Sequence, residues 1–262
     1  MQRFRIVAVL AVFTASTALA QYTSSYGYSF NNPMSALAND FFFQNMNKRA
    51  LLRSMLKKRG YTDEKLNAMT LDGMIAALGG TRKAVEASRE VPAPTSTKFK
   101  PAGKRLLVPT LAASLSQDKA QQQALVELFE QGIKAYEQEA AKDGFVNDLA
   151  GAIAFFIGTA YFVFHEGQEP DEDGLTLFAR QLQHAMDTPD LKKVGAADKQ
   201  KFYELLVGMG TWLGVSYQHA ARDGDEALKA QLKDAAGGVL KGYLKLEPSK
   251  LTFTANGLVI AP

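Results

Sequence analysis

Apolar residues recur at helical spacing through most of the chain after residue 110. Over residues 118–142 they return every three or four positions between charged and amide side chains, which predicts an amphipathic helix. Similar patterns predict helices over residues 175–187 and 198–222, and a last one that ends near Leu246. Residues 251–260 alone suit strands. The pattern predicts an all-α fold, a bundle of about five main helices with short connections.

Residues 149–164 form an almost unbroken apolar run, for which Asn147 or Asp148 is the expected N-cap. A helix of this length spans about 24 Å, less than the hydrocarbon thickness of a bilayer. Because a helix that is apolar on all sides is usually buried, we expect the central helix of the bundle. Membrane insertion and a ligand-lined cavity are the alternatives.

Small residues suggest where helices approach closely. Ala154 and Gly158 form one small pair, and Gly210 and Gly214 form another. If the chain reverses at Asp143-Gly144, Tyr136 lies near Gly151 or Ala152 and its ring fills the groove that they leave.

The first third of the chain is organised differently. Residues 1–20 carry Arg3 and Arg5, then a short apolar run, then Ala18-Leu19-Ala20, which together predict a signal peptide cleaved before Gln21. A membrane anchor that is never cleaved is the alternative. The predicted organisation is a signal peptide (1–20), a basic helical region (21–90), a Pro-rich extended linker (91–103) and a helical bundle domain (104–262).

Charge is divided unevenly along the 262 residues. Residues 21–110 hold 14 Lys+Arg and 6 Asp+Glu, so this part is basic. Residues 111–262 hold 14 Lys+Arg and 21 Asp+Glu, so this part is acidic. An exported chain does not meet nucleic acid, so the basic part should face anionic lipid, an acidic envelope polymer or the acidic bundle itself. The absence of Cys excludes disulfides, thiolate metal sites and cysteine nucleophiles.

A basic amphipathic helix is predicted to end before Gly60, with Leu51, Leu52, Met55 and Leu56 on its apolar face. This face would rest either on an anionic membrane or on the bundle, and we favour the bundle. The candidate residues for contact with an anionic surface are Lys48, Arg49, Arg53, Lys57 and Lys58.

The candidate catalytic and metal-binding motifs in the sequence match known motifs only in part. His165-Glu166 begins like a zinc-protease motif, but Glu169 stands where the second His is required, and His165 is better explained as a helix C-terminus that favours the protonated ring. Residues 169–174 resemble the start of an EF-hand loop but lack its final Glu. His184 and His219 are expected to be exposed. We expect no cofactor, no metal and no catalytic residue.

Several segments resemble a family of exported bacterial helical proteins that is catalogued only as a domain of unknown function. The resemblance covers residues 99–260 and implies a bacterial source and a helical fold, with no activity carried over. It rests on residues 99–103, 147–152 and 224–225. Its candidate structural motif consists of Tyr136, Asn147, Asp148, Gly151 and Tyr161.

Three functions stay open on these patterns. The favoured one is a non-catalytic protein, periplasmic or secreted, that acts through contacts with an anionic membrane surface or another envelope protein. The second is a carrier that holds an apolar ligand between aromatic-rich helices. The third is an enzyme with an unrecognised site, so an enzyme is the less favoured class.

Overall fold

The computed structural model describes residues 6–11, 60–62, 64–65, 94–244 and 246–260. Within this part of the chain the fold is an all-α bundle with one small two-stranded sheet, as the hydrophobic pattern predicts. The basic helix predicted before Gly60 lies outside the described residues.

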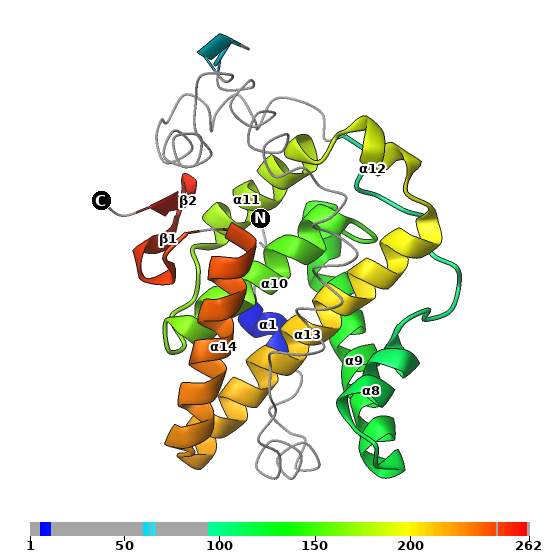
Figure 1. Cartoon of the computed structure of the whole chain (residues 1–262), viewed down its shortest axis with the longest axis vertical. Helices are drawn as coiled ribbons and strands as arrows, with labels where there is room; N and C mark the ends of the chain where they lie inside the picture. The colour runs from blue at the N-terminus through cyan, green and yellow to red at the C-terminus, as the bar shows by residue number, and fades with distance from the viewer. Residues whose placement is uncertain (1–5, 12–59, 63, 66–93, 245, 261–262) are drawn as a thin grey trace.

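The helix α10 (Leu149–Phe164) occupies the centre of the bundle (Figure 1). Each of its residues from Leu149 to Val163 is buried, which confirms the predicted central helix. It packs against three helices, α11 (Glu172–Ala185), α13 (Ala196–Asp223) and α14 (Glu226–Leu244). None of the described helices is both long enough and apolar enough to cross a membrane.

Helices α9 (Lys119–Ala140) and α10 are joined by a short turn, η2 (Ala141–Asp143). Gly144 follows with φ of 76°, a left-handed conformation that glycine adopts without steric cost. The predicted break at Asp143-Gly144 is therefore confirmed. The turn brings Tyr136 of α9 against Gly151 of α10: a Cβ built on Gly151 would lie 2.7 Å from the tyrosine hydroxyl.

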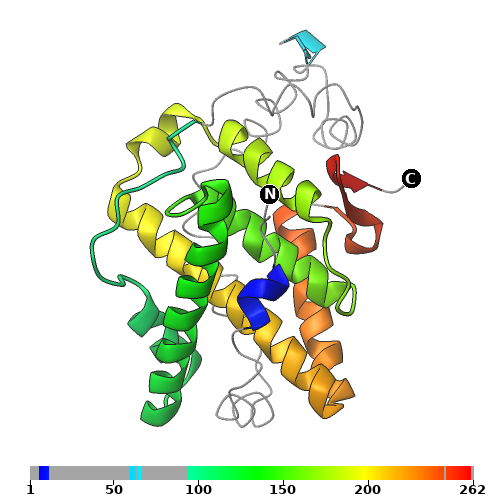
Figure 2. The same ribbon diagram turned by 180° about the vertical axis from the view of Figure 1, so that it is seen from behind.

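Helix α13 crosses the bundle and packs on both α9 and α10 (Figures 1 and 2). The small residues predicted at close approaches lie there: a Cβ on Gly210 would lie 2.9 Å from the ring of Phe155. Two short helices were not predicted, α8 (Val108–Leu115) before α9 and α12 (Pro189–Lys193) before α13.

The chain ends in a β-hairpin that follows the turn η3 (Pro248–Lys250). Strands β1 (Leu251–Thr254) and β2 (Gly257–Ile260) pair antiparallel, which confirms the strand pattern seen in the sequence. The hairpin packs on α11, where Gly174 lets the backbone of Thr254 approach.

The N-terminal helix α1 (Ile6–Ala11) packs on the body of the bundle, mainly against α9 and also against α13 and α10. Figure 2 shows it crossing the face between α9 and α14. Ile6, Val9 and Leu10 are each at most 2% exposed and belong to the main hydrophobic core. Three residues of the apolar run predicted as part of a signal peptide therefore fill a place in the core.

Candidate functional site

Asp148 lies at the N-terminus of α10 and is completely buried. One carboxylate oxygen accepts hydrogen bonds from the backbone N–H of Ala150, at 2.8 Å, and of Gly151, at 3.4 Å. The other accepts from the Thr97 hydroxyl at 3.0 Å and from the Gln183 amide at 2.7 Å. A buried carboxylate is stable only when it is paired or hydrogen-bonded, and here both oxygens are used by the fold.

The extended segment before α8 forms backbone hydrogen bonds with the N-terminal end of α10. The Leu149 N–H donates to the Thr97 carbonyl at 3.0 Å, and the Phe99 N–H donates to the Asn147 carbonyl at 3.1 Å. Asn147 has φ of 52°, in the left-handed region that Asn tolerates better than most residues. Asn147 and Asp148 of the predicted motif thus anchor an extended segment to the central helix.

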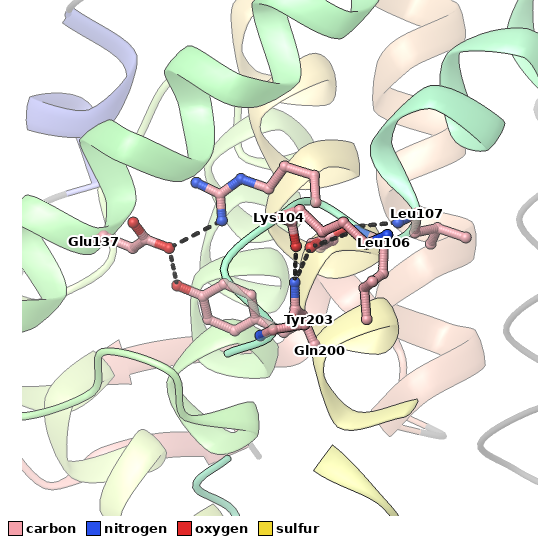
Figure 3. A network of polar contacts seen from close by, with 9 residues as sticks. Lys104, Leu106, Leu107, Glu137, Gln200 and Tyr203 are labelled. Carbon is pink, nitrogen blue, oxygen red and sulfur yellow. Dashed lines mark hydrogen bonds and ion pairs between the residues drawn. The ribbon is translucent and has the colours of Figure 1, made fainter. Parts of the chain in front are cut away.

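The same segment continues along α13, where a second buried carboxylate holds it (Figure 3). Glu204 is completely buried and accepts hydrogen bonds from the backbone N–H of Leu106 and of Leu107, at 2.9 and 2.7 Å. The Gln200 amide donates to Glu204 at 2.8 Å and to the Lys104 carbonyl at 2.6 Å. We call residues 96–107 the strap.

Lys199 secures the beginning of the strap. Its ammonium donates to the Ser96 carbonyl at 2.7 Å, and burial lowers the pKa of this lysine. The extended segment predicted over residues 91–103 is non-helical from residue 94 onward, but from Ser96 it is held to α10 and α13. Its second half is therefore part of the bundle, and the division of the chain into domains stays a prediction.

An aromatic cluster lies between the strap and the helices. The ring of Tyr203 lies 5.2 Å from that of Phe99 and 5.7 Å from that of Tyr136, which in turn lies 5.1 Å from Phe155. Burial raises the pKa of both tyrosines well above its ordinary value. The Tyr203 hydroxyl donates to Glu137 at 3.4 Å, next to the ion pair of Glu137 with Arg105 (Figure 3).

The predicted structural motif divides between the two ends of α10. Tyr136, Asn147, Asp148 and Gly151 lie together at its N-terminus. Tyr161 lies near the other end, with its ring 4.2 Å from His165 and 5.2 Å from Phe253.

The histidines differ from the sequence prediction in two respects. His165 does cap the C-terminus of α10, but burial lowers its pKa, so the neutral ring is favoured there. His184 and His219, expected to be exposed, are 6% and 3% exposed. Burial also lowers the pKa of His219, whose ring is hydrogen-bonded to Arg222 at 2.8 Å. Both lie on helix faces that neighbouring elements cover, which periodicity alone does not identify.

The weak metal motifs have structural roles. Glu166 has a left-handed backbone and forms an ion pair with Lys233 of α14. Asp171 is the N-cap of α11 and accepts from the Gly174 N–H at 2.8 Å. Among the residues that the structure describes, no three His, Asp or Glu side chains are grouped so as to hold a metal ion.

The remaining feature is the groove that holds α1, which we call the α1 groove. Ile6 and Leu10 project over two glycines on different helices. A Cβ on Gly158 of α10 would lie 2.5 Å from Ile6 Cδ1, and a Cβ on Gly214 of α13 would lie 2.6 Å from Leu10 Cδ1. Leu175 of α11 borders the first site and Thr159 of α10 the second. The sequence pattern predicts these glycines at close approaches between helices of the bundle, but it does not indicate that α1 packs on them.

The candidate residues for contact with an anionic surface lie outside the described residues, so their role stays a prediction. They are Lys48, Arg49, Arg53, Lys57 and Lys58.

Comparison with known proteins identifies a family but no activity. The chain belongs to a family of unknown function (DUF6683), which it matches over residues 2–261. The match includes the N-terminal third, beyond the residues on which the resemblance rested. No curated protein and no solved structure matches the chain significantly.

Proposed function

We propose that this member of a family of unknown function is an exported bacterial protein that acts by binding, not by catalysis, and that its binding site is the α1 groove. The apolar run of residues 6–13, between two arginines and Ala18-Leu19-Ala20, supports export to the periplasm or the medium and a mature chain that starts at Gln21.

The observation that carries the proposal is that Ile6, Val9 and Leu10 fill the α1 groove. These residues lie upstream of the predicted cleavage site, so removal of the signal peptide uncovers the groove. Burial of an aliphatic side chain is worth about 1.5–3 kcal/mol, so three such side chains are worth roughly 5–9 kcal/mol. This free energy becomes available to a ligand that takes their place.

The buried acids support a binding role in another way. Asp148 and Glu204 each accept three or more hydrogen bonds from groups that hold the strap or start a helix. A carboxylate whose oxygens are occupied by the fold serves as a rigid anchor. Both carboxylates are therefore committed to holding the fold together, which leaves the α1 groove as the site proposed for binding.

The proposed partners are an anionic membrane surface or another envelope protein, and not nucleic acid. For the five basic residues of the predicted amphipathic helix, docking on the acidic bundle stays favoured over contact with a membrane, whereas the α1 groove would meet an apolar segment. A carrier of a small apolar ligand is the second candidate, and the same groove supports it.

Two measurements test the proposal. N-terminal sequencing of the exported protein should find Gln21, and retention of Met1 would refute export with cleavage. A fluorescent dye that binds apolar surfaces should bind chain 21–262 more strongly than chain 1–262, because α1 fills the groove only in the longer chain. Equal dye binding by the two chains would refute the groove as the binding site.

The membrane partner has its own test. If the basic helix rests on a membrane, chain 21–262 should sediment with anionic vesicles in a salt-sensitive manner. Replacement of Lys48, Arg49, Arg53, Lys57 and Lys58 by Gln should then abolish this sedimentation, at about 1 kcal/mol per residue. If the wild type does not sediment and the variant only melts at a lower temperature, the basic helix docks on the bundle.

A further inference from the structure

The α1 groove has two separate sockets, each made by a glycine within a helix. Gly158 and Gly214 have ordinary helical conformations, so neither is required by its backbone geometry. A glycine inside a helix destabilises it relative to alanine. What the glycines provide is space: any Cβ at these two positions would collide with Ile6 or Leu10.

The occupant of the sockets has the spacing of one helix face. Ile6, Val9 and Leu10 stand at positions i, i+3 and i+4, which lie together on an α-helix. Helix α1 packs against α9, α10 and α13, and the side chains of Ile6 and Leu10 lie over Gly158 and Gly214, with Leu175 of α11 beside the first. This is the arrangement in which a groove recognises a short apolar helix through a few anchor side chains.

An unbranched acyl chain matches this groove less well. The two sockets lie on different helices, and each receives the terminal methyl of a separate side chain, Ile6 Cδ1 in one and Leu10 Cδ1 in the other. A helix carries both branches on a rigid backbone. A single acyl chain has no side branches, so it would fill one socket while passing beside the other.

We propose that the α1 groove of the mature protein is a receptor for a short aliphatic helix of another polypeptide, with branched side chains at positions i, i+3 and i+4. This inference rests on the proposed function, in which residues 1–20 are removed. The signal segment in the structure shows the mode of binding, and the partner helix replaces it.

The test uses the chain's own segment as a probe added in trans. A labelled peptide of residues 3–13, with lysines appended for solubility, is titrated with chain 21–262 and followed by fluorescence anisotropy. We expect saturable binding. Peptide variants Ile6→Asn and Leu10→Asn should each bind at least about tenfold more weakly, because a polar amide would enter an apolar socket. A peptide of the same composition without the i, i+3, i+4 spacing should not bind.

Protein variants locate the binding to the sockets. Gly214→Leu fills the Leu10 socket and should abolish peptide binding, and Gly214→Ala should weaken it. The matched control is Gly238→Leu, because Gly238 of α14 is exposed and a Cβ there meets no atom within 4 Å. Circular dichroism melts check that each variant is folded. Chain 1–262 should bind the peptide weakly, since its tethered α1 competes at high effective concentration.

Three results of the binding experiments would overturn the inference in addition to a plain absence of peptide binding. The first is equal affinity for the peptide without the helical spacing, and the second is unchanged affinity in folded Gly214→Leu. The third is displacement of the peptide by oleate below its micellar concentration, with oleate binding lost in Gly214→Leu, which would assign the groove to an acyl chain. Retention of Met1 in the exported protein would refute the proposed function instead, whatever the peptide does. A start at Gln21 without peptide binding would refute this inference alone.

Discussion

Replacement of Asp148 by alanine should destabilise the bundle far more than loss of an ordinary helix cap. Loss of an N-cap side chain costs about 1 kcal/mol. In addition, the buried Thr97 hydroxyl and Gln183 amide lose their shared acceptor, at about 1–3 kcal/mol for each buried donor left without a partner. The sum for Asp148→Ala is roughly 3–7 kcal/mol, among the largest effects of single substitutions.

Asp171→Ala is the matched control, because Asp171 is also an N-cap aspartate. It caps α11 through a single bond to the Gly174 N–H, and its side chain receives no hydrogen bond from the strap. Its replacement should cost only about 1 kcal/mol. The difference between the two variants, about 2–6 kcal/mol, measures what Asp148 contributes by joining the strap and α11 to α10.

Urea denaturation of both variants and of the wild type measures these differences as changes in the free energy of unfolding. A thermal melt should agree, since a domain of this size shifts by about 2–4 °C per kcal/mol. A double variant, Asp148→Ala with Thr97→Val, should lose less than the sum of the two single losses, because the unpaired hydroxyl is then absent. Equal destabilisation by Asp148→Ala and Asp171→Ala would refute the argument that the buried carboxylate holds the strap.

Three further predictions concern the α1 groove, the strap and the histidines. Gly214→Ala should lower the melting temperature of chain 1–262 more than that of chain 21–262, because the new Cβ meets Leu10 only in the longer chain and meets Thr159 in both. Gly238→Ala should stabilise both chains by up to about 1 kcal/mol through helix propensity. An equal shift of the two chains by Gly214→Ala would contradict the socket. Limited proteolysis of chain 21–262 should cut before Ser96, where the strap begins, and a first cut within residues 97–107 would contradict the role of the strap. Burial lowers the pKa of His165 and His219, so the unfolded chain binds more protons than the folded one below about pH 6.5. The free energy of unfolding should therefore fall as the pH is lowered from 7.5 to 5.5. In urea titrations at these two pH values, the double variant His165→Gln with His219→Gln should show a smaller fall.

The sequence by itself determined the helices and their order. Periodicity identified α9, α10, α11, α13 and α14, because long amphipathic or apolar segments carry a signal over several turns. Local chemistry fixed the turn at Asp143-Gly144 and the cap at Asp148, since a left-handed glycine and an N-cap side chain act within a few residues. Helices α8 and α12 are too short for periodicity to identify them.

Only the tertiary structure decided what these elements hold between them. Glu204 meets the N–H groups of Leu106 and Leu107 across about a hundred residues of chain, so no local pattern marks it as an anchor. His184 and His219 are buried by neighbouring elements, a property of packing and not of their own helices. Gly158 and Gly214 do meet other helices of the bundle, at Leu175 and Thr159, as the sequence predicts. Only folding adds α1 at the same two positions, because it brings three distant segments to one place. Helix periodicity reports which face is apolar, and the fold alone decides what that face meets.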